Sequence, residues 1–209
     1  MIMRRFLSGI FLLVLGFLVL GAQNKVTPSM VLSKTVNRIT GSRGVDASFK
    51  VYNSGYSGSG VLKMSGSKFI VSLPDAKVWY NGKDMYTYNE SSGETTLVTP
   101  TAQELAETNP LEYVKGAQAK YNVAYSTVKK KDRYVLELTP KVKSKGEIKR
   151  ITLTVKQADF TPEKIVVETA GASPISADIL TFKTGIAIPE SDFQYPKTKY
   201  PKVEIIDLR

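Results

Sequence analysis

The sequence predicts a mainly β protein in which one helix precedes an antiparallel sheet and a second helical segment interrupts it. Three observations support this fold class. Residues 58–98 form short apolar runs separated by turn residues, including Asn81-Gly82, a dipeptide that favours a β-hairpin with positive φ at both positions. Residues 28–39 carry apolar side chains at helical spacing. Residues 101–114 break the β pattern with helical turns.

The N-terminal segment has the layout of a secretory signal peptide. Arg4 and Arg5 make the start positive, residues 6–20 are almost uninterruptedly apolar, and Gly21-Ala22 supplies small residues for cleavage. The alternative is an uncleaved membrane anchor, although the apolar run is shorter than the ~20 residues that a membrane-spanning helix prefers. We therefore expect cleavage near Ala22, residues 1–22 as signal peptide, a periplasmic location, and a single domain over residues 23–209.

Composition removes several classes of active site. The chain contains neither Cys nor His, which excludes disulfides, a Ser-His-Asp triad, a Cys nucleophile and His-ligated metal sites. The carboxylate pairs that remain, Glu104 with Glu107 and Asp84 with Glu94, have the positions of cap or surface residues. We therefore expect no enzyme activity, no catalytic residue, no metal and no cofactor.

The chain carries an excess of positive charge. Removing Arg4 and Arg5 with the predicted signal peptide lowers the formal net charge from +10 to +8. In the cytosol this excess would favour nucleic acid, but in an exported protein we expect no nucleic acid, and anionic lipid head groups or an acidic protein are the better partners. The basic runs at residues 129–133 and 141–150 are expected at hairpin tips, where solvent exposure is the ordinary explanation and a docking patch is the alternative.

The first predicted element is an amphipathic helix over residues 28–39. Its apolar side chains include Val31, Leu32 and Val36 on one face. Thr27 is placed to cap the helix, and Pro28 suits its first turn because its missing N–H is not needed there. The strand pattern begins after this helix, with apolar and polar residues alternating over residues 45–53.

A helical insertion interrupts the sheet. Thr101 and Glu104 have the spacing of a capping box, and a second short helix begins at Asn109-Pro110. The insertion carries few apolar residues, so it needs an apolar surface to remain helical. It is either a lid or a simple connector. Strand patterns resume at residue 121 and continue to a final pair at residues 193–195 and 203–208.

Several of these features occur in an order that is typical of one protein family. They are the N-terminal amphipathic helix, Val45-Asp46-Ala47-Ser48-Phe49, Gly60-Val61-Leu62-Lys63-Met64, Asn81-Gly82-Lys83-Asp84-Met85-Tyr86-Thr87-Tyr88-Asn89, the helices of residues 100–114, Leu136-Glu137-Leu138-Thr139-Pro140-Lys141, and Pro201-Lys202-Val203-Glu204-Ile205-Ile206-Asp207. In this order the chain resembles the periplasmic outer-membrane lipoprotein carrier family, LolA, and its LolA-like relatives. The resemblance covers the mature chain nearly end to end.

The resemblance implies an unclosed, or half, antiparallel β-barrel whose concave apolar face is covered by the N-terminal helix and the mid-chain insertion. It implies a monomeric periplasmic carrier that shields lipoprotein acyl chains and transfers them from an inner-membrane exporter to an outer-membrane acceptor. The alternative is a LolA-like binder of other lipids or lipopeptides, with an envelope-sensing or different export role. A purely structural envelope protein is a further alternative, which a filled, dry core would indicate.

We expect ligand-binding side chains on the sheet and lid side chains on the helices. The period of two does not show which face of a strand is concave, and ordinary sheet core is the other interpretation of the same residues. The predicted ligand-binding residues are Phe49, Val51, Leu62, Met64, Phe69, Val71, Trp79, Met85, Tyr86, Tyr88 and Phe182. The predicted lid residues are Val31, Leu32, Val36, Leu105, Leu111 and Val114.

One departure from the family concerns how the lid is held. The best-studied family members place an Arg after the Gly-x-Leu strand, where it bonds to the lid and helps to hold the closed state. Residues 64–68 of this chain contain no Arg. Lys68 offers only a point charge there, without the planar fork of a guanidinium.

Overall fold

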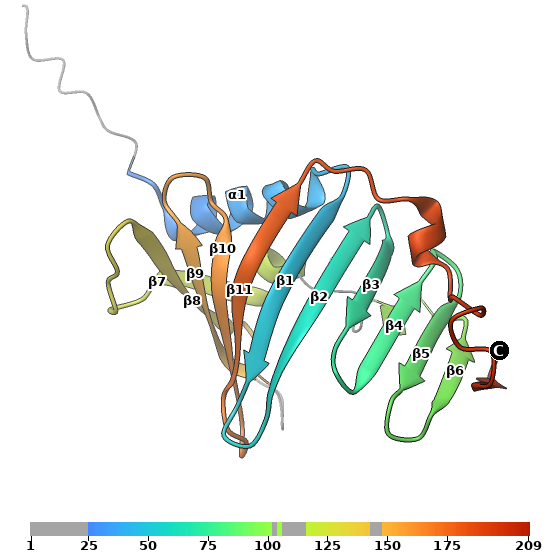
Figure 1. Ribbon diagram of the computed structural model, residues 1–209. Helices are drawn as coiled ribbons and strands as arrows, with labels where there is room; N and C mark the ends of the chain where they lie inside the picture. The colour runs from blue at the N-terminus through green and yellow to red at the C-terminus, as the bar shows by residue number, and fades with distance from the viewer. Residues whose placement is uncertain (1–24, 102–103, 106–115, 143–147) are drawn as a thin grey trace, which may run out of the picture.

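The computed structural model describes residues 25–101, 104–105, 116–142 and 148–209. Within these ranges the chain forms one twelve-stranded sheet with the order β12-β6-β5-β4-β3-β2-β1-β11-β10-β9-β8-β7. The sheet is strongly curved, and its outermost strands β12 and β7 are not paired with each other among the described residues (Figure 1). The predicted fold class, a mainly β, unclosed barrel covered by helix, is confirmed.

Helix α1 precedes the sheet, a short 3-10 helix η1 lies near the C-terminus, and every strand except β12 runs antiparallel to its neighbours. The elements are α1 (Pro28–Thr40), β1 (Val45–Tyr52), β2 (Ser57–Ser65), β3 (Lys68–Ser72), β4 (Ala76–Tyr80), β5 (Met85–Asn89), β6 (Glu94–Val98), β7 (Tyr121–Tyr125), β8 (Arg133–Pro140), β9 (Ile148–Lys156), β10 (Pro162–Thr169), β11 (Ile175–Thr184), η1 (Glu190–Phe193) and β12 (Glu204–Asp207).

Helix α1 begins where its sequence predicts. The hydroxyl oxygen of Thr27 accepts a hydrogen bond from the backbone N–H of Met30 at 3.2 Å, and Pro28 occupies the first turn. Its buried face holds Val31 and Leu32, which pack against residues of β8 and β9. In the part of the chain that the structure describes, no helix has the length and hydropathy needed to cross a membrane.

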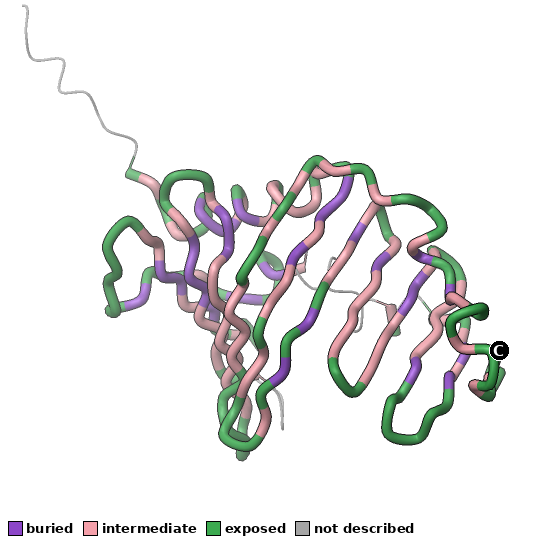
Figure 2. Tube along the Cα trace, in the orientation of Figure 1, coloured by how far each residue is buried: buried purple, intermediate pink, exposed green. Residues whose placement is uncertain are grey.

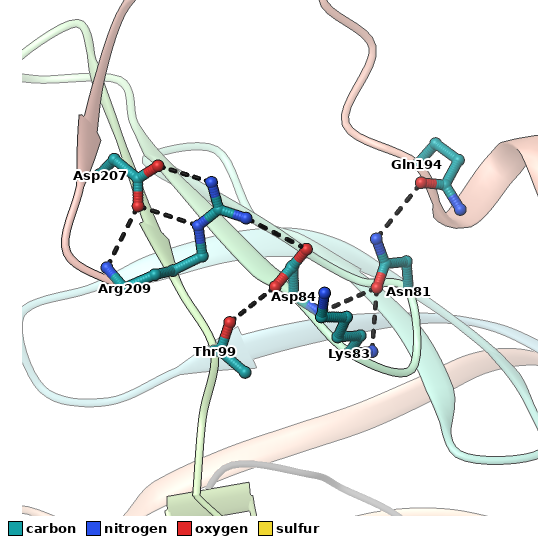
Figure 3. Close-up of polar contacts among 7 residues, drawn as sticks. All are labelled: Asn81, Lys83, Asp84, Thr99, Gln194, Asp207 and Arg209. Carbon is teal, nitrogen blue, oxygen red and sulfur yellow. Dashed lines mark hydrogen bonds and ion pairs between the residues drawn. The ribbon is translucent and has the colours of Figure 1, made fainter.

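The predicted hairpin at Asn81-Gly82 is present, but its turn differs from the predicted one. Only Gly82 has a positive φ, at 99°. The side-chain oxygen of Asn81 instead accepts hydrogen bonds from the backbone N–H groups of Lys83 and Asp84, at 3.0 and 2.9 Å (Figure 3). Asn81 therefore stabilises a four-residue loop through its side chain, as Asn often does in turns, rather than through a left-handed backbone.

Burial alternates clearly along β6 and in the first halves of β1 and β2, and most residues of the loops between the strands are exposed (Figure 2). The concave face carries two apolar clusters. One lies under α1 and contains Leu136, Leu153 and Val155. The other contains Val45, Met64, Phe69 and Tyr80, with Leu105 of the insertion packed against it.

The C-terminal segment covers the convex side of strands β2 to β6. Tyr195 and Tyr200 pack edge-on against Trp79, with ring centroids 5.3 and 5.9 Å from its own. Lys63 forms an ion pair with Asp192 at 2.9 Å, and Phe193 is buried at the end of η1. The prediction of a strand at residues 193–195 is wrong. Phe193 and Tyr195 attach the C-terminal segment to the convex face and do not add a strand to the sheet.

Arg209 fastens the last strand to the hairpin of β4 and β5 (Figure 3). Its Nη2 donates a hydrogen bond to Oδ2 of Asp207 at 2.6 Å, and its Nη1 lies 3.6 Å from Oδ2 of Asp84. Asp84 also accepts a hydrogen bond from the hydroxyl of Thr99 at 2.7 Å. Hydrogen bonds from the side chain and the backbone N–H of Arg209 lower the pKa of Asp207 to about 2.

We predict that Arg209→Gln returns the pKa of Asp207 towards the ordinary value of about 3.9. The wild-type pair stabilises the fold above that value, and its contribution is lost as the pH falls through about 2, because the folded state then must take up a proton. An NMR titration of the Asp207 carboxyl group measures both values. Lys199→Gln, which removes an exposed cation elsewhere, should leave the pKa unchanged, and a wild-type value near 3.9 contradicts the prediction.

Candidate functional site

A cavity of about 360 Å³ lies between α1 and the concave face of the sheet. Its volume falls in the range of small-molecule binding pockets, roughly 300 to 1,000 Å³. Its walls come from α1, from β1 and β2, from Ala117 and the start of β7, and from β8 to β11. The lining residues are Leu32, Thr35, Val36, Ile39, Ala47, Phe49, Leu62, Met64, Ala117, Tyr121, Leu138, Ile151, Leu153, Pro162, Ile165, Val167, Ala177, Ile179 and Phe182.

The lining of the cavity is almost entirely apolar. No Asp, Glu, Lys or Arg is among the described residues that line it. The hydroxyl of Thr35 donates a hydrogen bond to the carbonyl oxygen of Val31 at 3.0 Å, so helix α1 satisfies this polar group itself. A charged ligand group would lose its hydration here without gaining a partner. The cavity is therefore suited to apolar ligands, which it contacts without directional bonds.

The wall formed by β1 and β2 depends on Gly60. Phe49 and Gly60 are partners across the two strands. A Cβ atom at Gly60 would lie 2.5 Å from the ring atom Cζ of Phe49 and 2.9 Å from the carbonyl oxygen of Ser72. Glycine at this position lets the Phe49 ring approach the β2 backbone closely. The ring consequently forms part of the wall of the cavity.

The structure brings some of the predicted ligand-binding and lid residues to this cavity. Phe49, Leu62, Met64 and Phe182 line it, as do Leu32 and Val36 of α1. Val51 lies farther along β1, half-buried and outside the lining.

Other predicted residues lie beside the cavity. Phe69, Val71 and Met85 belong to the second concave cluster, together with Leu105. Val31 is fully buried and attaches α1 to the sheet. The remaining predicted lid residues, Leu111 and Val114, lie outside the described residues.

Trp79, Tyr86 and Tyr88 lie on the opposite face of the sheet. Tyr80 is the cross-strand partner of both Phe69 and Met85, and these three share the concave face. Because side chains alternate along a strand, the neighbouring partners Trp79 and Tyr86 must share the convex face. There they form a cluster with Tyr195 that does not reach the cavity.

The residues predicted from the sequence omit much of the opposite wall, which β9, β10 and β11 provide. Its side chains include Ile151, Leu153, Ile165, Val167 and Ile179. The apolar residues of these strands recur with a period of two. This alternation is the sequence signal that could have identified them as residues of one sheet face.

Two contacts at the tip of the β9–β10 hairpin hold α1 at this end of the cavity. Arg38 forms an ion pair with Asp159, with Nη2 and Oδ2 3.3 Å apart. The Nζ atom of Lys34 lies 4.6 Å from the ring centroid of Phe160. Phe160 stacks on Tyr134 and has an unusual positive φ of 58°.

Lys68 does not take part in holding α1. Its ammonium group forms an ion pair with Glu190 of η1, in the C-terminal segment. The attachment of α1 to the hairpin tip is thus made by other cations, which lie on the helix itself.

The carboxylates considered as catalytic pairs have structural roles where the structure describes them. Glu104 accepts hydrogen bonds from the backbone N–H and the hydroxyl of Thr101, which confirms the predicted capping box and lowers the pKa of Glu104. Asp84 binds Thr99 and Arg209, Glu94 is exposed in β6, and Glu107 lies outside the described residues. Within the described ranges, no three acidic side chains are placed to hold a metal ion.

The sequence matches a family model described as "Outer membrane lipoprotein carrier protein LolA" over residues 18–170. The chain belongs to this family. A search of the curated proteins finds no match. The family match spans α1, the cavity-lining strands β1 and β2, and the opposite wall as far as β10.

Solved structures resemble this LolA-family chain at low identity. An uncharacterized conserved protein from Thermus thermophilus is 11% identical, with a TM-score of 0.58 over 86% of this chain and 98% of that one. A putative outer membrane lipoprotein-sorting protein domain from Vibrio parahaemolyticus is 12% identical, with a TM-score of 0.45 over 82% and 97%. The MucA/MucB complex of Pseudomonas aeruginosa is 11% identical, with a TM-score of 0.43 over 80% and 60%. The first of these likenesses supports the fold, and the fold alone.

We predict that Gly60→Ala destabilises the protein by about 1–3 kcal/mol, because the new methyl group overlaps the Phe49 ring and the Ser72 carbonyl oxygen. Gly55→Ala is the matched control, since nothing lies within 4 Å of a Cβ built there. Urea unfolding measures both changes. Adding Phe49→Ala should recover part of the loss in a double-mutant cycle, and a neutral or stabilising Gly60→Ala contradicts the proposed wall.

Proposed function

We propose that this LolA-family chain is a periplasmic carrier that shelters lipoprotein acyl chains in the cavity beneath α1. The observation that supports this function is the apolar lining of that cavity. Helix α1 and strands on both sides of the sheet contribute side chains to it. In the proposal the chain receives its cargo from an inner-membrane exporter, delivers it to an outer-membrane acceptor, and acts as a monomer without catalysis. Its membership of the lipoprotein carrier family is consistent with that task.

The need for shelter follows from the energy of hydrating acyl chains. Each methylene group exposed to water costs about 0.8 kcal/mol, so a chain of some fifteen methylenes costs on the order of 12 kcal/mol. A carrier must cover much of this surface and still release it. Contacts that are apolar and non-directional can be exchanged for other apolar contacts without leaving a polar group unpaired.

Helix α1 is the element that we expect to move when cargo enters. Leu32, Val36 and Ile39 form one wall of the cavity, and an acyl chain can replace their apolar contacts with the sheet. The polar attachment of α1 is weak, because the Arg38 and Asp159 side chains are 33% and 44% exposed, and exposed ion pairs contribute about 0–1 kcal/mol. Competition between α1 and the cargo would keep net affinity within a reversible range.

A second candidate is a LolA-like binder of other lipids or lipopeptides, with an envelope-sensing or different export role. The observation that favours it is the position of Lys68. This residue pairs with Glu190 of η1, and residues 64–68 hold no Arg that would contact a lid in the manner of the best-studied family members.

The cargo itself can be identified by purifying the protein from its native envelope and analysing what is bound by mass spectrometry. We expect acylated lipoproteins to co-purify. Recovery of free lipids or lipopeptides without lipoprotein would favour the second candidate. A preparation free of any acylated molecule would contradict both.

We predict that Ala177→Phe weakens binding of apolar ligands at least several-fold, because the ring would project into the cavity beside Ile165. Ala187→Phe makes the same change at an exposed position and should bind normally. Displacement of a fluorescent apolar dye by a triacylated lipopeptide measures the affinity. Trp79 is unsuitable as the reporter, since it lies on the convex face. Equal affinities for both variants would show that ligands bind elsewhere.

A further inference from the structure

The loop between β7 and β8 carries a cluster of unpaired positive charge. It presents Val128, whose exposed fraction is 59%, followed by the exposed Lys129, Lys130 and Lys131. We call these four residues the basic tip. Within the described part of the chain, none of the three ammonium groups has an ion-pair partner. Some lysines of the sheet do form ion pairs, among them Lys63 with Asp192, Lys68 with Glu190 and Lys164 with Asp178.

The basic tip is held in place by the strands around it. The hydroxyl of Ser126 donates to Oε1 of Glu137 at 2.6 Å, and the backbone N–H of Val128 donates to Oγ of Ser126 at 3.2 Å. The backbone N–H of Gln157 donates to the carbonyl oxygen of Asp132 at 3.1 Å, which joins the loop to the neighbouring β9–β10 hairpin. The exposure of Val128 is therefore built into the fold.

The N-terminal end of the domain lies next to the basic tip. The hydroxyl of Tyr125 donates a hydrogen bond to the carbonyl oxygen of Val26 at 2.7 Å, and both segments are at the left of Figure 1. Lys25, which is exposed, adds a further cation at this end.

The sequence that precedes this end is the apolar segment of residues 6–20, which we expect to enter the membrane during export. Residues 21–24 span at most roughly 14 Å when fully extended. While the segment is in a bilayer, it would hold this end of the domain close to the lipid head groups.

We propose that the basic tip docks the domain on an anionic phospholipid surface. Val128 would enter the interface, and Lys129, Lys130 and Lys131 would contact lipid phosphates. An exposed apolar side chain beside several cations is the composition of peripheral membrane contacts. The attraction of lysines to an anionic leaflet is additive and decays within a Debye length of ~8 Å at physiological salt.

A membrane explains the exposed Val128, which an acidic protein partner does not require. Before the predicted signal peptide is removed, the apolar segment joined to the same end of the domain would also bring the basic tip close to a membrane. The proposal goes beyond the carrier function, because it concerns the protein without cargo and does not depend on the cavity.

Vesicle flotation of the cargo-free protein tests the proposal. The full chain is expressed, and the N-terminus of the purified protein is determined by mass spectrometry. It is then mixed with vesicles of phosphatidylcholine alone or with added phosphatidylglycerol. The test variant replaces Lys129, Lys130 and Lys131 by Gln. The control variant replaces Lys197, Lys199 and Lys202 by Gln, so both variants lose the same charge. These three lysines are exposed in the C-terminal segment, at the other end of the sheet.

We expect the wild type and the control variant to bind vesicles with phosphatidylglycerol, and binding by the test variant to fall at least tenfold. Val128→Ser should weaken binding less, and added salt should weaken it in the wild type. Three results would overturn the proposal: no wild-type binding, equal losses in both triple variants, or retention on immobilised polyglutamate without vesicle binding. The last would assign the basic tip to an acidic protein. Normal dye binding by the test variant would show that its cavity is intact.

Discussion

The cavity exists because small side chains line a concave surface that larger ones would fill. Protein interiors pack as densely as organic crystals, so a strongly curved sheet under a helix normally contains no void of this size. Here Ala47 of β1, Ala177 of the neighbouring β11 and Ala117 ahead of β7 give the lining three small side chains, and Gly60 has no side chain beneath the Phe49 ring. This sparse lining is the constraint on which the binding hypothesis depends. The cavity also argues against the interpretation of the chain as a structural envelope protein with a filled core.

The concave face of the sheet is divided between binding and stability. Strands β3 to β5 contribute Phe69, Tyr80 and Met85 to a packed cluster, whereas β8 to β11 face the cavity. The first group is also covered on its convex side by the C-terminal segment, through Trp79 and the tyrosines that surround it. One part of the sheet is therefore packed on both faces, and it can support a neighbouring part that is not.

Sequence patterns predicted the elements better than the faces of those elements. Thr27, Pro28 and Thr101 act locally, so the helix and the capping box were predictable from neighbouring residues alone. The orientation of Trp79 and Tyr86 was not, because a period of two fits either face equally well. The deciding residues, Tyr195 and Tyr200, lie more than a hundred positions away in the sequence, and their packing on the convex face depends on tertiary structure. The central part of the insertion, residues 106–115, lies outside the described residues.

The backbone at Phe160 has a consequence for how this region can vary. A left-handed conformation costs a bulky residue on the order of 1 kcal/mol or more, and glycine would adopt it freely. The aromatic ring, however, stacks on Tyr134 and supports Lys34 of α1. Glycine would relax the main chain and at the same time remove the contact with Lys34 of α1, whereas another aromatic residue would preserve this contact at the same local cost. Position 160 therefore carries a strained backbone in exchange for the aromatic contacts with Tyr134 and with Lys34 of α1.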